Sequence, residues 1–193
     1  MTDDAAPRTR AVPATDLALV GTGAALVAVC SLLAIPVGAA GVPITLQTFA
    51  VLLAGAVLGA RRGALAVLLY LLVGFAGLPV FAEGAGGLST FGKVTLGYLL
   101  AFPVAAWVVG AVVQRAARYG WAARLGVVAG AGVLGTLVVY AVGVPVLAAR
   151  AGLSLAEALV ANAAFVPFDL VKVAMVAVVA TAVHRAFPDL LRG

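Results

Sequence analysis

Charged residues are scarce in this sequence, and histidine and cysteine are almost absent. Of 193 residues, 10% are charged, one is histidine and one is cysteine, whereas 65% are hydrophobic, and the mean hydropathy is +1.22. A soluble globular chain is nearer half apolar and a quarter charged, and so much apolar surface cannot be buried inside one small water-soluble particle. Composition therefore excludes a soluble enzyme, a disordered tail and a disulfide scaffold. It indicates a protein that crosses the membrane several times.

The residue types that build catalytic and metal sites are missing too. Cys30 has no second cysteine for an intramolecular disulfide. His184 has no ligand-type partner for a metal, and we expect it at the membrane interface. No serine lies in a G-x-S-x-G elbow. The segment GLSTFGK (87–93) imitates a phosphate-binding loop, but Val94 stands where that motif requires Ser or Thr. The twelve basic residues are spread along the chain, which is not typical of a nucleic-acid surface. We therefore expect no catalytic residue, no metal, no cofactor and no nucleic acid.

Long apolar runs are abundant. The first, residues 17–35, would span about 28 Å as a helix, close to one bilayer core. Breaks occur at the Pro-bracketed segment 36–43, at Arg61-Arg62, in the Gly-rich segment 81–93, at the basic turn 115–120, and in a loop that contains the amphipathic piece 153–162. We predict an all-α integral membrane protein, a bundle of six transmembrane helices at residues 17–35, 44–59, 63–80, 94–114, 121–149 and 167–186.

The ends of the chain are more polar than the bundle. We predict a disordered tail over residues 1–16, a membrane domain over 17–187 and a second short tail over 188–193. A cleaved signal peptide is an alternative interpretation of the first run, although the run is longer than a typical signal core and five more follow. The run 121–149 is long enough to contain a further break.

Basic residues predict the orientation of this bundle. With the N-terminus in the cytoplasm and six crossings, two basic residues lie outside, Lys93 and Arg150, and Lys172 lies inside the last span. The other nine lie on the cytoplasmic side: Arg8, Arg10, Arg61, Arg62, Arg115, Arg118, Arg124, Arg185 and Arg192. This bias favours a multi-pass protein of the cell membrane with both termini in the cytoplasm.

Few polar side chains lie within the spans, and the unusual ones share one depth. Asp169 and Lys172 are three residues apart, so they share a helix face and can pair. Each charge at bilayer depth costs about 2.5–3.5 kcal/mol on insertion scales, which makes such residues functional candidates. Gln47 and Tyr98 are predicted near the outer ends of two other spans. A common depth on independent helices predicts a binding pocket that opens outward.

Each of these residues also has a structural explanation. Asp169 follows Pro167 in what would be the first helical turn, where a carboxylate complements the positive end of a helix. Lys172 could extend its side chain to the outer interface. Gln47 could form an interhelical hydrogen bond, and Tyr98 could belong to an interfacial aromatic belt. The sequence alone leaves these alternatives open.

Four segments make the sequence resemble a known family. VPITLQTFAVLLAGAVLG (42–59), RRGALAVLLYLLVGFAGLPVFA (61–82), LGYLLAFPVAA (96–106) and FDLVKV (168–173) resemble the BioY family. This family comprises biotin-binding S components of energy-coupling factor (ECF) vitamin transporters. The resemblance covers roughly residues 17–187. It implies a six-helix protein that takes up biotin from outside, without enzymatic activity of its own.

The resemblance also implies site residues and partners. Asp169 and Lys172 match the acid–lysine pair of the family's biotin pocket, and Gln47 matches the ITLQ segment beside it. Some relatives carry polar residues where this chain aligns Ala85 and Leu99, and Lys93 is a candidate to replace one of these contacts. Residues 36–43 and 81–93 are expected to be lids. The implied partners are a transmembrane coupling subunit and two ABC-type ATPases, some relatives being thought to work without them.

Two small residues on the first span are candidates for partner contact. Ala24 and Ala28 are four residues apart, and such pairs let helices approach closely. We expect them to dock on the coupling subunit. Two alternative functions remain open from the sequence, namely an S component for another vitamin and a self-sufficient ion-coupled carrier that uses Asp169 as a proton site.

Overall fold

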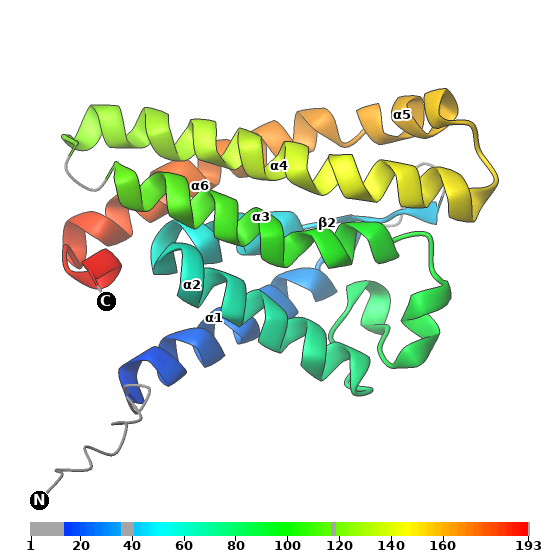
Figure 1. The fold of residues 1–193 in the computed structure, drawn as a ribbon, viewed down its shortest axis with the longest axis horizontal. Coiled ribbons are helices and arrows are strands. Elements are labelled where there is room, and N and C mark those ends of the chain that lie inside the picture. Colours follow the sequence, from blue (N-terminus) through cyan, green and yellow to red (C-terminus); the bar gives the residue numbers. More distant parts are fainter. Residues whose placement is uncertain (1–13, 36–40, 117–118, 193) are drawn as a thin grey trace, which may run out of the picture.

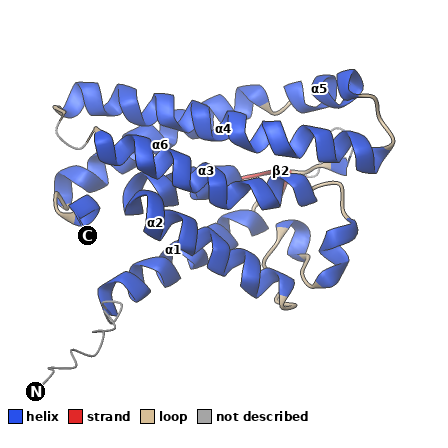
Figure 2. Ribbon diagram, in the orientation of Figure 1, coloured by secondary structure: helices blue, strands red, loops and turns tan. Residues whose placement is uncertain are grey.

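Helices dominate the computed structural model, which describes residues 14–35, 41–116 and 119–192 (Figures 1 and 2). Five helices are long and apolar enough to cross a membrane. These are α1 (Ala14–Leu32), α2 (Gln47–Phe75), α3 (Leu96–Arg115), α4 (Trp121–Ala151) and α6 (Val166–Ala186). The prediction of an all-helical membrane protein is therefore confirmed.

Element α2 consists of two helical halves that form a tight hairpin. Gly59 has φ 82° and ψ 179°, outside the helical region and in a conformation that glycine adopts at little cost. A Cβ atom built on Gly63 would lie 2.7 Å from the Cα of Gly55, although eight residues of straight helix would separate them by about 12 Å. The chain therefore reverses at Gly59, where the sequence predicts a break between two spans.

The hairpin is closed by a side chain from α3. The side-chain Oε1 of Gln114 accepts a hydrogen bond of 3.2 Å from the backbone N–H of Ala60, which the reversal leaves without a helical partner. His184 on α6 approaches the same turn, with Nε2 3.4 Å from the carbonyl oxygen of Val57. His184 is 3% exposed and lies in the last turn of α6, so its depth at the membrane interface stays a prediction while its side chain faces the protein. It packs inside the bundle because α6 turns that face toward the hairpin.

Several predicted boundaries shift. Helix α1 begins at Ala14, inside the segment predicted as a tail, and ends at Leu32 rather than residue 35. The predicted spans 44–59 and 63–80 shorten at their outer ends, since α2 starts at Gln47 and stops at Phe75. Helix α4 is unbroken despite Pro145. The predicted loop 36–43 lies partly outside the described residues, since residues 36–40 are not described. The predicted loop 81–93 folds into short turns.

Short irregular elements occupy one end of the bundle. Strands β1 (Ala34–Ile35) and β2 (Ile44–Thr45) pair antiparallel. The Gly-rich segment contains two 3₁₀ turns, η2 (Ala82–Gly84) and η3 (Leu88–Gly92). Helix α5 (Leu155–Ala163) is the predicted amphipathic piece, and Ser154 and Glu157 form a capping box at its start. Hydrogen bonds from Ser154 lower the pKa of Glu157. The last element, η4 (Leu190–Arg192), lies at the opposite end of the bundle.

The two ends of the bundle differ in charge. We call the end that holds Gly59 and the α3–α4 turn the basic end, since it carries Arg61, Arg62, Arg115, Arg124 and Arg185. The start of α1 and the last element, η4, lie on that side in Figure 1. The other end, which we call the pocket end, carries β1, β2, η2, η3 and α5, with Lys93 and Arg150. The two sets of basic residues are therefore separated by the length of the bundle, as the predicted threading requires.

Helix α1 is the least buried of the five long helices. Its Ala24 is 7% exposed within the main hydrophobic core, and Ala28 packs against the same core. The pair thus packs inside the bundle, which does not agree with its expected role as a docking surface. Small residues allow α1 to approach α2 closely, and the outward face of α1 presents Leu17 and Val29 instead. At the basic end, Asp16 and Arg62 form an ion pair of 2.5 Å that fixes the start of α1 to α2.

Candidate functional site

A cavity of about 380 Å³ opens at the pocket end. All five residues predicted to bind a substrate line it: Gln47, Lys93, Tyr98, Asp169 and Lys172. They come from four separate parts of the chain, namely the start of α2, the segment after η3, the start of α3 and the start of α6. The polar residues predicted to share one depth therefore do lie around one space.

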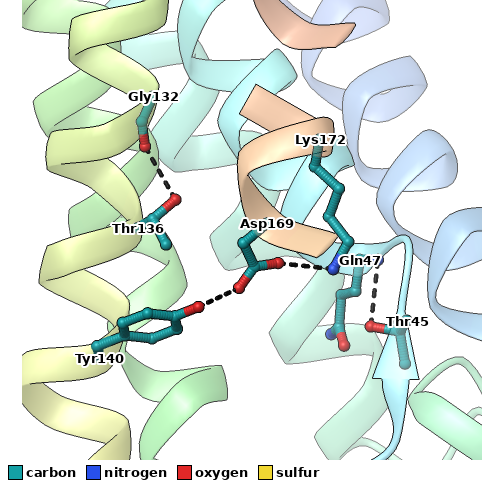
Figure 3. Close-up of polar contacts among 7 residues, drawn as sticks. All are labelled: Thr45, Gln47, Gly132, Thr136, Tyr140, Asp169 and Lys172. Carbon is teal, nitrogen blue, oxygen red and sulfur yellow. Dashed lines mark hydrogen bonds and ion pairs between the residues drawn. The ribbon is translucent and has the colours of Figure 1, made fainter. Parts of the chain in front are cut away.

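Asp169 and Lys172 form a buried ion pair in the first turns of α6 (Figure 3). The Nζ of Lys172 donates a hydrogen bond of 2.7 Å to Oδ1 of Asp169. Asp169 is 5% exposed and Lys172 is 6% exposed, so Lys172 does not extend to the membrane interface. A buried ion pair is weak evidence for stability because desolvation opposes the attraction. Its position on a cavity favours a functional role.

Tyr140 on α4 contacts the Asp169–Lys172 ion pair through Asp169 (Figure 3). Its hydroxyl donates a hydrogen bond of 2.5 Å to Oδ2 of Asp169, so each carboxylate oxygen has one donor from the protein. Tyr140 also lines the cavity. Each carboxylate oxygen has two acceptor positions, which leaves capacity for a donor from a ligand. One turn earlier on α4, the hydroxyl of Thr136 bonds the carbonyl oxygen of Gly132 and takes no part in the site.

Gln47 is held between the two halves of the α2 hairpin. Its backbone N–H donates to Oγ1 of Thr45 at 3.2 Å, and its Nε2 donates to the hydroxyl of Tyr70 at 2.7 Å. The interhelical hydrogen bond that the sequence left as an alternative is therefore present. Gln47 nevertheless lines the cavity with the amide oxygen still available as an acceptor. The hydrogen bond to Tyr70 therefore holds the Gln47 side chain in place with its amide oxygen available to a ligand.

Aromatic rings connect Gln47 to the segment that covers the cavity. The ring of Tyr70 meets Phe81 edge-on at 5.4 Å between centroids, Phe81 meets Phe75 at 5.2 Å, and Phe75 stacks on Phe91 at 4.5 Å. Arg150 then donates a hydrogen bond of 2.7 Å to the carbonyl oxygen of Phe91. Element η3 is thus fixed from both sides, and its expected role as a lid stays a prediction.

Tyr98 is buried rather than interfacial. It is 9% exposed, and its hydroxyl donates a hydrogen bond of 3.0 Å to Oδ1 of Asn162 on α5. This burial excludes the aromatic-belt alternative. Lys93, by contrast, is exposed at the mouth of the cavity, whose lining also includes Glu83. The mouth therefore presents one cation and one carboxylate, whereas the interior holds the Asp169–Lys172 pair.

Tyr70, Tyr140 and Asn162 were not predicted from the sequence. Three of the four tyrosines of the chain, Tyr70, Tyr98 and Tyr140, are hydrogen-bonded in or beside the cavity. Their phenol groups within apolar spans were an available signal. Across the described ranges there is also no group of three or more His, Cys, Asp or Glu residues that could hold a metal ion.

Comparison with known proteins identifies the family. The profile of the BioY family matches residues 4–189. This chain belongs to the BioY family. The BioY chain is 40% identical to "Biotin transporter BioY" of Rhizobium etli over 90% of its own length and 95% of the relative's. It is 42% identical to the protein of that name from Rhodobacter capsulatus, over 91% and 96% of the two chains.

A solved structure shows the same fold. The BioY chain superposes with a TM-score of 0.81 and 26% identity on a crystal structure of the S-component for biotin from an ECF-type ABC transporter. The match covers 89% of this chain and 92% of that one. The prediction of the BioY family is confirmed. The chain is a multi-pass membrane transport protein and not an enzyme.

Proposed function

We propose that this BioY protein binds biotin from the outer side of the membrane and delivers it inward together with an ECF energy-coupling module. The observation that carries the proposal is the cavity that Gln47, Tyr140, Asp169 and Lys172 line at the pocket end. Its volume of about 380 Å³ lies within the range of small-molecule sites, about 300–1,000 Å³. Relatives of the same length bear the name biotin transporter.

The chemistry of the cavity suits biotin. Biotin combines a ureido ring that donates and accepts hydrogen bonds, an apolar sulfur ring and a carboxylate tail. In our proposal Asp169 accepts a ureido N–H, and Gln47 orients the ring through its amide oxygen. Lys172 either compensates the charge of Asp169 or donates a second hydrogen bond to an acceptor of the ligand. Lys93 and Tyr98 complete the binding set at the mouth and on α3.

The proposal includes an orientation and six membrane crossings. The two halves of α2 count as separate crossings because the chain reverses at Gly59. With the basic end in the cytoplasm, both termini are cytoplasmic, as the positive-inside rule favours, and the cavity opens outward. Residues 1–16 and 188–193 then lie on the cytoplasmic side, although residues 1–13 are outside the described ranges.

Energy for transport comes, in this proposal, from partner subunits: a transmembrane coupling subunit and two ABC-type ATPases. The chain has no phosphate-binding motif of its own, since the similar segment GLSTFGK lies at η3 beside the cavity and lacks the required Ser or Thr. The likeness to an S-component from an ECF-type ABC transporter supports the proposal that separate subunits hydrolyse ATP.

The test is biotin binding to purified wild type, Asp169→Asn and Lys172→Ala protein by calorimetry. Both changes leave a buried charged group without its partner, so we expect at least about tenfold weaker binding. Thr136→Val is the matched control, since its hydroxyl is buried nearby but bonds only Gly132. Unchanged affinity in both site variants would remove the proposed site.

Two rival functions have separable outcomes. Competition by thiamin or riboflavin but not by biotin would indicate an S component for another vitamin. Uptake by the chain alone in liposomes, dependent on a proton gradient, would indicate a self-sufficient carrier. The second rival needs Asp169 to exchange protons, yet both carboxylate oxygens of Asp169 already accept hydrogen bonds, from Lys172 and from Tyr140.

A further inference from the structure

A second cavity, of about 220 Å³, lies at the basic end. It is formed where α4 begins and α6 ends, and it is lined by Tyr119, Trp121, Arg124, Thr181 and Arg185. The length of the bundle separates it from the proposed biotin site, with which it shares no lining residue. Its occupant is therefore independent of the proposed function.

The charges around this cavity select an anion. Arg124 and Arg185 come from two helices and line the same space, and the described lining residues include no carboxylate. Arg124 also has an interaction within the protein, so the exposed Arg185 is the main candidate to contact an anion. Helix α4 begins beside it at Trp121, and no side chain caps its first turn, so the positive end of a 31-residue helix adds to the field. Guanidinium groups bind phosphate oxygens with matching geometry.

The surroundings select an anion that carries an apolar tail. The rings of Trp121 and Tyr119 are half-exposed at 55% and 50%, as amphipathic rings are at the headgroup level of a membrane. On α6, Val178 and Val171 lie seven and fourteen residues before Arg185, so they continue along the same face toward the middle of the bundle. Both valines are exposed, which provides an apolar path for an acyl chain.

We propose that this cavity binds the phosphate of an anionic phospholipid, with Arg185 on the phosphate, Arg124 beside it and an acyl chain along α6. Basic pockets between transmembrane helices are suited to such headgroups. A free phosphate ion offers the same oxygens to the arginines but has no acyl chain to cover Val178 and Val171. The two sources can therefore be told apart by experiment.

The experiment measures thermal unfolding of the purified full chain in neutral detergent, with added phosphatidylglycerol, phosphatidylcholine or inorganic phosphate. Because a ligand stabilises the state that it binds, we expect phosphatidylglycerol to raise the unfolding temperature more than the other two additions. Native mass spectrometry of the wild type should show preferential retention of phosphatidylglycerol over phosphatidylcholine. This second measurement requires no variant.

The variant is Arg185→Gln, an exposed position. Loss of a charge-assisted hydrogen bond should weaken phosphatidylglycerol binding about tenfold or more, with Arg185→Lys retaining part of it. The control is Arg115→Gln, at the same end, because Arg115 bonds the carbonyl oxygen of Ala111 on its own helix and does not line the cavity.

Equal stabilisation of Arg185→Gln and wild type by phosphatidylglycerol would overturn the proposal. Equal stabilisation of the wild type by phosphatidylcholine would do the same, and equal stabilisation by phosphate would assign the site to a free anion.

Discussion

Among single residues, Tyr140 has the most informative position. Two charges in the first turns of α6 would be costly at bilayer depth, and the hydroxyl of Tyr140 shares the carboxylate of Asp169 with Lys172. This shared arrangement fixes the orientation of the Asp169 carboxylate in the cavity. It also means that neither charge on α6 is available to move freely toward a ligand.

Tyr140→Phe tests that role. The change removes one donor from Asp169 while preserving the aromatic ring, so we expect biotin binding to weaken and the free energy of unfolding to fall by about 1–3 kcal/mol. Calorimetry and thermal unfolding in detergent would measure the two effects. Tyr119→Phe, at the exposed basic end, serves as the control. If Tyr140→Phe bound biotin as tightly as the wild type, the hydroxyl would have no part in the site.

The rare polar types made part of the site predictable from the sequence. Asp169, Lys172 and Gln47 are recognisable because each is unusual in an apolar span. Tyr140 was not predicted, since α4 is apolar all round and its sequence does not specify which face turns inward. Asn162 was not predicted, since the sequence of the amphipathic helix α5 does not specify what its polar residues contact. Both contacts depend on tertiary packing, in which Tyr98 bonds Asn162 and Tyr140 bonds Asp169.

At the scale of the elements, Gly59 determines the arrangement of α2. Run lengths and the Arg61-Arg62 pair predict a break between two spans, and the structure places the reversal at the glycine just before them. The sequence does not reveal how tight the hairpin is. That depends on Gly55 and Gly63, which allow the two halves to touch, and on Gln114, which satisfies the backbone of Ala60.

Gly59→Ala should destabilise the protein. Residue 59 has a positive φ, and a Cβ there would lie 2.6 Å from Nε2 of Gln114. Backbone strain of this kind costs about 1–3 kcal/mol, to be measured as a loss in the free energy of unfolding. Gly126→Ala is the matched control, because no atom lies within 4 Å of its added Cβ and the residue is in the middle of a helix. There we expect no loss or a gain of up to about 1 kcal/mol. Equal effects of the two changes would contradict the hairpin argument.

The short elements at the pocket end could not be predicted from sequence patterns. Strands β1 and β2 have two residues each, too few for an alternating pattern to be recognised. The turns η2 and η3 depend on glycines and on the stack between Phe75 and Phe91. Irregular backbone of this kind is tolerated at membrane depth only where it lines a cavity or is covered by protein, which fits its position at the pocket end.

For the whole molecule, the separation of basic residues determines the expected orientation. The basic end carries Arg61, Arg62, Arg115, Arg124 and Arg185, whereas the pocket end carries Lys93 and Arg150. Because positive residues favour the cytoplasmic side, the cavity should face outward. The composition alone made the membrane class predictable, whereas the threading that the distribution of arginine favours stays a prediction.

Single-cysteine labelling would test the orientation. In a Cys30→Ala background, Ser89→Cys at the pocket end should react with a membrane-impermeant maleimide in intact cells. Gly120→Cys at the basic end should react only after the membrane is opened. Both positions are exposed, so accessibility reports the side of the membrane rather than burial. The reverse pattern of labelling would place the cavity in the cytoplasm.

The first half of the α2 hairpin is short, and its length determines how deep Gln47 lies below the outer boundary of the hydrocarbon core. From Gln47 to the turn it holds 12 residues, which rise about 18 Å of a hydrocarbon core roughly 30 Å thick. With the turn at the inner boundary, Gln47 lies about 12 Å below the outer one. In the proposed orientation, a vitamin molecule at rest against Gln47 would therefore have crossed about two fifths of the hydrocarbon core by diffusion alone, before the proposed ATPase partners act.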